Sequence, residues 1–416
     1  MTMVTVMSAP DAQQGLPEGV QGTADRHFDP VVKAFAKLYT GRRAGGGALT
    51  VRLHGETVLD IWAGHSDRAG RAAWTRDTAP IVFSVSKGLS STIIHRLADR
   101  GLIEYDKPVA EYWPAFGKSG KHAVTVRKVM AHEAGLSQLG GIINEYADYF
   151  DHELIEDRLA SAWADRFAGK PAYHAFTYGW ILSGLARAVT GKGMRDLFRQ
   201  ELAEPLGVEH IHLGRPPESS PTQLAAFVGA RIPSTSPAQQ VIQFGRKWTP
   251  FKRLIEACIP EPGMEKILHG DHPPILDGEM PAASVVVTAP VLATVYAALA
   301  GGGSVDGTQL LQPETVRQLS ARRDPRNRAT YQPDRVLGVP MMWHLGYHSL
   351  LTPVTLTGFG HIGIGGSAGW ADPSNGIAVG YVHNRTPVTM LTDQASFPLL
   401  WPLILRAAKR RDASGR

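Results

Sequence analysis

Residues 81–101 constrain the fold of this chain more than any other stretch. Apolar residues recur there every four positions, at Val85, Leu89, Ile93 and Leu97. This spacing predicts the buried face of an α-helix that ends near Gly101. Ser84 therefore falls at or just before the helix N-terminus, close to unpaired backbone N–H groups and the positive end of the helix dipole.

Ser84 and Lys87 form the one Ser-x-x-Lys pair of the sequence. Three residues along a helix is about one turn, so the lysine amine comes within hydrogen-bond reach of the serine hydroxyl. A serine hydroxyl is a weak nucleophile until such a base removes its proton. The alternative is that Ser84 only caps the helix and Lys87 is solvated. A single match to this short pattern is weak, so partner motifs decide between the two interpretations.

Composition excludes several classes of function. The 416-residue chain carries a net charge of +5 that is spread along its length. Its densest basic cluster is near the C-terminus and consists of Arg406, Lys409, Arg410 and Arg411. We interpret this cluster as a solvated tail, with contact to an anionic membrane surface as the alternative. No nucleic-acid-binding motif is present, so nucleic acid is not expected as a partner.

The sequence predicts a soluble, cytoplasmic protein. Cys258 is the only cysteine, so no internal disulfide can form. The first residues do not resemble a signal peptide, and no apolar run approaches the roughly 20 residues that span a membrane. The 16 histidines are scattered. Neither a His-Glu-x-x-His motif nor a cysteine pair occurs, so no metal or cofactor is expected.

The order of predicted elements indicates an α+β protein. A helix over 28–39 precedes two strands over 48–54 and 57–62. Helical patterns dominate from Gly101 to about Pro281. Strands return over 343–347, 355–363, 368–372 and 377–383, and a helix over 397–411 closes the chain. We therefore predict one α/β domain from residues 1–80 and 283–416, and a mostly helical domain over 81–282 that carries the serine helix.

Four short signatures occur in a fixed order along the chain. They are Ser84-Val-Ser-Lys87, Met130-Ala-His-Glu-Ala-Gly-Leu136, Tyr173-His-Ala175 and His361-Ile-Gly363. As an ordered set, spread over about residues 45–405, they resemble the serine β-lactamase and penicillin-binding-protein superfamily. The resemblance is to its class C-like branch and is closest to the family VIII carboxylesterases, including actinobacterial lipase/esterase-type members. It implies a β-lactamase-like fold, with an antiparallel sheet flanked by helices and a mostly helical second domain.

The resemblance also assigns roles to residues. Ser84 would be acylated, and Lys87 would act as base or proton relay, helped by a pKa lowered through burial. Tyr173 would share the proton with the lysine; the alternative is a core aromatic. We interpret His132 as structural, because its turn lies outside the catalytic set of the family.

The third motif would lie on an edge strand beside the serine. His361 and Gly363 are candidate substrate-binding residues, and the alternative for His361 is that it only packs. The N–H of Ile364 would form the oxyanion hole with the N–H of Ser84. Each such donor contributes roughly 3 kcal/mol.

Two departures from the β-lactamase pattern indicate the substrate. Ala175 stands where the family has asparagine, and His361 where it has lysine, so an amide and a fixed cation are missing. We therefore predict a serine carboxylesterase that hydrolyses small to medium-chain esters through a Ser84 acyl-enzyme. The alternatives are acyl transfer from the same intermediate, weak β-lactamase activity, or a catalytically silent binding protein. The expected partner is a small-molecule ester, and the oligomeric state is left open.

Two further stretches bear on function. Gly365-Gly-Ser367-Ala-Gly369 fits the Gly-x-Ser-x-Gly nucleophile elbow of α/β-hydrolases. That fold needs a helix next, followed by an acid and a histidine, whereas Asp372-Pro373 follows here. We instead expect glycines that allow close backbone approach in an edge strand. A helix over 251–259, with Met264, Ile267 and Leu268, is a candidate wall of the acyl pocket; the alternative is ordinary core.

Overall fold

A large antiparallel sheet organises the molecule. The computed structural model describes residues 15–41, 44–228, 264–271, 273–320, 334–336, 339–350, 358–385, 393 and 395–415. Nine strands pair in the order β1-β3-β2-β15-β14-β13-β12-β11-β10. They are β1 (Val20–Ala24), β2 (Gly46–Leu53), β3 (Glu56–Gly64), β10 (Asp334–Val336), β11 (Val339–His344), β12 (Tyr347–Leu350), β13 (Phe359–Ile362), β14 (Ala368–Asp372) and β15 (Ile377–His383).

Strands from both ends of the described chain meet at the centre of this sheet. The β2–β3 hairpin confirms the two strands predicted over 48–62, and β15 pairs with β2 from Ile377–Leu53 to His383–Gly47. Every residue of β2 and of β15 is buried. Both strands are therefore covered on both faces. The division into two domains at residues 80 and 283 stays a prediction.

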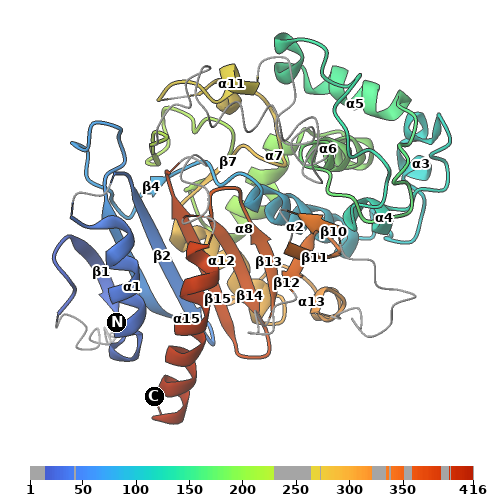
Figure 1. Cartoon of the computed structure of the whole chain (residues 1–416). Helices are drawn as coiled ribbons and strands as arrows, with labels where there is room; N and C mark the ends of the chain where they lie inside the picture. The colour runs from blue at the N-terminus through green and yellow to red at the C-terminus, as the bar shows by residue number, and fades with distance from the viewer. Residues whose placement is uncertain are drawn as a thin grey trace, which may run out of the picture.

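Helices cover the two faces of the sheet (Figure 1). On one face lie α1 (Asp29–Tyr39) and α15 (Ser396–Ala413), whose apolar sides share a core with Trp370 on β14. On the other face α12 (Ala289–Ala300) packs against β15, β14 and β2. The helix lies close because Gly380 has no side chain: a Cβ there would come within 2.2 Å of the Ala289 carbonyl oxygen. The predicted helices over 28–39 and 397–411 are confirmed.

The serine helix has the predicted position and buried face. It is α2 (Val85–Asp99), with Ser84 as the N-cap and Gly101 just beyond its end at a φ of 73°. The predicted stripe of Val85, Leu89, Ile93 and Leu97 is fully buried. The helix contacts β12, β13 and β14 on one side and α6 on the other, so it lies where sheet and helical region meet.

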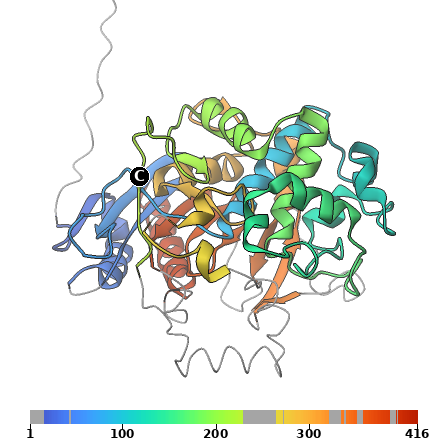
Figure 2. The same cartoon turned by 90° about the horizontal axis from the view of Figure 1, so that it is seen from above.

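Helices dominate the stretch after α2 and gather at one side of the sheet (Figure 2). They are α3 (Val109–Tyr112), α4 (Val126–Met130), α5 (His152–Ser161), α6 (Thr177–Thr190), α7 (Met194–Phe198) and α8 (Glu204–Leu206). Later come α11 (Met264–Ile267) and α13 (Pro313–Ser320). Short strand pairs add β4 (Thr78–Ala79) with β6 (Gln223–Leu224), β5 (Ile211–Leu213) with β7 (Val285–Val287), and β8 (Ser304–Val305) with β9 (Thr308–Gln309).

The prediction that the third motif and the following glycines lie on edge strands is wrong. β13, which carries His361, is paired with β14 on one side and β12 on the other, and the sheet continues to β10. The segment predicted as one strand over 343–347 is instead a hairpin, with β11 and β12 joined at Leu345 and Gly346, both at positive φ. Because β12, β11 and β10 follow β13 in the sheet, the expected edge lies in its interior.

Two predictions concern membranes and the acyl pocket. Within the described ranges, no helix is long and apolar enough to cross a bilayer. The predicted helix over 251–259 lies outside the described residues. Of the accompanying apolar residues, Ile267 is fully buried and Leu268 is partly buried.

Candidate active site

The backbone before Ser84 is held in an unusual conformation. Phe83 has a φ of 47°, in the left-handed region that a bulky residue seldom adopts. The preceding residue, Val82, donates its N–H to the Val285 carbonyl at 2.9 Å, which fixes the entry to the turn. Strain of this kind persists where the surroundings over-determine it, and it is concentrated at functional sites.

The Ser84 hydroxyl does not cap its helix. It makes no capping bond to the first turn of α2. Its oxygen instead lies 2.7 Å from the Tyr173 hydroxyl and accepts a hydrogen bond from Lys87 Nζ at 3.1 Å. The cap interpretation of the sequence is therefore not what the structure has. The nucleophile candidate and both predicted proton-transfer groups lie in one hydrogen-bonded cluster.

Lys87 is fully buried beneath the serine. Its Nζ also donates to the Ala282 carbonyl at 3.0 Å and lies 4.9 Å from the centre of the Tyr173 ring. These contacts aim the amine at the Ser84 oxygen and fix it against rotation. A base held at hydrogen-bond distance from the proton it must take is the geometric requirement for general base catalysis.

Tyr173 is held by residues from the far end of the sheet. Its ring stacks on Trp343 of β11 at 5.0 Å between centroids and an interplanar angle of 8°. Its backbone N–H donates to the buried carboxylate of Asp334 on β10 at 2.6 Å. Neither Trp343 nor Asp334 is among the site residues predicted from the sequence. Neither belongs to a short motif: Trp343 begins the strand predicted over 343–347 but nothing local links it to Tyr173, and β10, which carries Asp334, was not predicted.

The third motif lies beside the serine, as predicted. At Gly363 a Cβ would come within 2.5 Å of the Val82 carbonyl oxygen and 3.5 Å of the Ser84 nitrogen, so only glycine fits without a shift of the backbone. Ile364 follows directly in the turn after β13. Within the described ranges, the N–H groups of Ser84 and Ile364 donate to no other residue. Both are therefore free to bind an oxyanion.

His361 is buried on β13, and its side chain faces other aromatic groups. Its ring contacts His348 at 4.9 Å and Trp343 at 5.9 Å between centroids. Its Nδ1 donates to the Ile362 carbonyl at 3.2 Å. Burial, the neighbouring His348 and the charge on Lys87 together hold the pKa of His361 well below its usual range. The ring is therefore neutral at physiological pH and supplies no fixed cation to the site.

Ser367 is not arranged as a nucleophile. It lies between the turn after β13 and the start of β14, with a strand rather than a helix following it. The side chain is buried, and its oxygen accepts the His383 N–H at 3.4 Å. The nucleophile-elbow interpretation fails because the strand–turn–helix that it needs is absent here.

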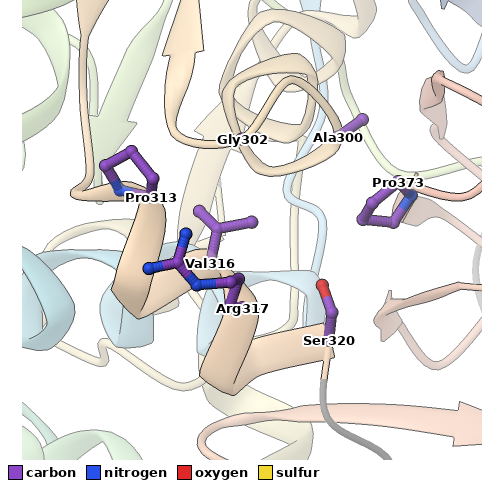
Figure 3. A pocket seen from close by; sticks show the side chains of 7 residues that line it. All are labelled: Ala300, Gly302, Pro313, Val316, Arg317, Ser320 and Pro373. Carbon is purple, nitrogen blue, oxygen red and sulfur yellow. The ribbon is translucent and has the colours of Figure 1, made fainter.

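Among the described residues, neither a metal centre nor the surface hollow beside Pro373 competes with this cluster. Over the part of the chain that the structure describes, no group of three His, Cys, Asp or Glu side chains could hold a metal ion. A surface hollow of about 480 Å³ lies between the end of α12, α13 and Pro373 (Figure 3). Pro373 follows the end of β14 that is remote from the Ser367 turn, so this hollow belongs to the opposite end of the sheet from Ser84.

Comparison with known proteins agrees with this geometry. Residues 25–396 match the Beta-lactamase family. The chain is 48% identical over 404 residues to the esterase/β-lactamase LipL of Mycobacterium tuberculosis, covering 95% of this chain and 90% of that protein. Among solved structures, a penicillin-binding protein homolog from Caulobacter crescentus aligns with a TM-score of 0.72 and 28% identity, covering 95% of this chain and 99% of the other. A family VIII carboxylesterase aligns with a TM-score of 0.72 and 28% identity, covering 94% and 99%.

Proposed function

Because the chain belongs to the Beta-lactamase family of serine hydrolases, we propose that it is a carboxylesterase acting on small to medium-chain esters through an acyl-enzyme on Ser84. The observation that carries the proposal is the hydrogen-bonded cluster of Ser84, Lys87 and Tyr173. The names of LipL and of the aligned family VIII carboxylesterase support ester hydrolysis in general.

Acylation begins with attack of the Ser84 oxygen on the ester carbonyl carbon. The serine proton passes to whichever of the two neighbours is unprotonated, the neutral amine of Lys87 or the phenolate of Tyr173, which lie 3.1 and 2.7 Å from that oxygen. The carbonyl oxygen becomes an oxyanion that the N–H groups of Ser84 and Ile364 stabilise. When the tetrahedral intermediate collapses, the C–O bond to the alcohol breaks and the alcohol leaves with the proton that the cluster returns.

Deacylation repeats these steps with water as the nucleophile. Water attacks the acyl carbonyl carbon and loses its proton to the same cluster. The Ser84 oxygen then leaves as the acid is released, and it regains a proton. Lys87 and Tyr173 thus serve as base in the first half of each step and as acid in the second.

The surroundings of the cluster favour neutral substrates. Ala175 packs with Tyr173 and Trp343 in a small apolar cluster, and it offers no amide. His361 is neutral, for the reasons given above. A site without an amide donor or a fixed cation loses affinity for peptide-like and carboxylate-bearing ligands more than for simple esters.

A panel of p-nitrophenyl esters from acetate to palmitate tests the proposal. We expect kcat/KM to be largest for short to medium acyl chains, because each methylene adds about 0.8 kcal/mol only while a pocket has room for it. Ser84→Ala should abolish hydrolysis of every ester. A maximum at palmitate would reject the stated substrate range, and full activity in Ser84→Ala would reject the mechanism.

Weak β-lactamase activity is a second candidate, favoured by the combined name of LipL. The same acyl-enzyme on Ser84 would open a lactam ring, but the missing amide and cation should make this slow. Hydrolysis of the chromogenic cephalosporin nitrocefin measures it directly. We expect a kcat/KM at least about a hundredfold below that for the best ester, the scale of losing two polar contacts.

A further inference from the structure

The backbone around Tyr173 has no regular structure, yet three successive N–H groups are bound. Ala172 donates to the His132 carbonyl at 2.9 Å, Tyr173 to Asp334 at 2.6 Å, and His174 to the His132 imidazole Nδ1 at 3.2 Å. Buried backbone N–H groups outside helices and strands need acceptors from other segments. Here His132 supplies two of the three, one on each side of the tyrosine.

His132 itself is rigidly placed. It is buried, and its φ is 60°, a left-handed conformation that is uncommon outside glycine. Its ring packs against Tyr173 at 5.2 Å, Tyr178 at 4.6 Å and the edge of Trp343 at 4.4 Å between centroids. A ring enclosed on three sides by aromatic groups cannot change rotamer without disturbing Tyr173.

The hydrogen bond from His174 requires a neutral imidazole with its proton on Nε2. Burial, followed by the neighbouring His174 and the charge on Lys87, holds the pKa of His132 well below its usual range. The Nδ1 lone pair is therefore available throughout the physiological range. Nε2 is buried and has no hydrogen-bond partner among the described residues. The polar contact that fixes this ring is thus the one beside Tyr173.

We propose that His132 is a positioning residue for Tyr173, which holds the tyrosine hydroxyl against Ser84 by accepting the N–H of His174. The inference rests on the proposed esterase function, because it concerns the group that shares the proton in that reaction. On the sequence alone His132 is interpreted as structural, and the geometry adds the catalytic consequence of that packing. A displacement of about 1 Å at a reacting group can cost about a hundredfold in rate.

Three variants separate hydrogen bonding from simple packing. Asparagine can place its side-chain oxygen where Nδ1 lies and readily adopts positive φ, so His132→Asn keeps the acceptor. Glutamine extends its amide toward the Nε2 position, so His132→Gln keeps a polar side chain of similar length without that acceptor. His132→Leu keeps apolar bulk alone. We expect kcat within about fivefold of the unaltered protein for Asn, and at least about fiftyfold lower for Gln and Leu, with KM changed by less than about threefold.

Two readouts keep the proposal and the proposed function apart. One is kcat with p-nitrophenyl butyrate, and the other is the rate at which a fluorophosphonate probe labels Ser84. If the unaltered protein is labelled at Ser84 but does not turn over esters, the esterase function fails, and the labelling rates of the variants still test the role of His132. Thermal unfolding of each variant measures the structural cost separately.

The outcomes are decisive in either direction. Retained rates for Asn, with loss for Gln at a comparable Tm, support positioning. The proposal is overturned if the Asn and Gln variants lose the same share of kcat and of labelling rate, or if both retain them. It is also overturned if the fall in rate across the variants only follows the fall in Tm. If the Leu variant does not fold, the comparison of Asn with Gln carries the test. Asp334→Asn, which keeps an acceptor for the Tyr173 N–H, should resemble His132→Asn, whereas Asp334→Ala should resemble His132→Gln.

Discussion

His95 makes the stability of this protein depend on pH in a way that can be measured away from the active site. The residue lies on α2 and is fully buried. Its Nε2 donates to the Leu345 carbonyl at 3.0 Å, and Nδ1 accepts from the Tyr105 hydroxyl at 2.7 Å. Burial lowers the pKa of His95 from 6.5 to about 3. The folded protein therefore holds this side chain neutral across most of the acidic range.

The sign of the effect follows from the two pKa values. In the unfolded chain His95 binds a proton below about pH 6.5, whereas in the folded chain it does so only near pH 3. The unfolded state thus binds more protons between these limits, and the free energy of unfolding falls as pH drops through that window. Between pH 8 and pH 5 the loss is about 1.5 pH units at 1.36 kcal/mol each, or roughly 2 kcal/mol.

His95→Gln provides the test. Glutamine can still donate to the Leu345 carbonyl but does not titrate. Between pH 8 and pH 5 the free energy of unfolding of the variant should therefore fall by about 2 kcal/mol less than that of the unaltered protein. Urea unfolding at both pH values gives the two differences, and His122→Gln at an exposed position is the matched control. If the free energy of unfolding falls between pH 8 and pH 5 by the same amount in both proteins, to within about 0.5 kcal/mol, the reasoning is refuted.

Three further predictions concern the site. Tyr173→Phe and Lys87→Ala should each lower kcat at least about a hundredfold, and the double variant should lose much less than the product of the two; multiplicative losses would contradict a shared proton path. Gly363→Ala should lower kcat by about a hundredfold with little change in KM or Tm, because its Cβ would lie 2.5 Å from a backbone carbonyl oxygen beside the oxyanion site; wild-type kcat would show that the strand can move at no cost. A fluorophosphonate probe should label the tryptic peptide that contains Ser84, and Ser367→Ala should leave labelling and hydrolysis within about tenfold; label on Ser367 would reverse the assignment of the nucleophile.

The sequence predicted those parts of the fold and site that local patterns specify. The four-residue spacing after Ser84 located α2, and the alternating runs beside His54 located the β2–β3 hairpin. The cluster of Ser84 with Lys87 could be foreseen because the two are one turn apart on a single helix. Tyr173 could be placed only through the family resemblance, since nothing local links it to a serine 89 positions earlier.

The parts that were missed depend on contacts between distant segments. The Asp334 carboxylate accepts a hydrogen bond from the backbone N–H of Tyr173, which lies 161 positions earlier in the chain. No periodicity in either segment predicts that contact. The turn at Leu345 and Gly346 was interpreted as the interior of one strand over 343–347. That error hid β12, whereas the edge position expected for β13 came from the family resemblance. The helix predicted over 251–259 as a wall of the acyl pocket lies outside the described residues, so it stays a prediction.

The contact between Lys87 and the Ala282 carbonyl, 195 positions later, has a consequence for the order in which the site assembles during synthesis. A ribosome that has released the first 250 residues has already exposed the serine, its lysine and its tyrosine. It has not yet made the carbonyl that orients the lysine, the glycine that borders the oxyanion site, or the central strand β15 that β2 needs for pairing. Contacts of such long sequence separation form late, because the intervening chain must first be closed into a loop. The arrangement of Ser84, Lys87 and Gly363 described above therefore cannot be complete until the chain has been made as far as β15.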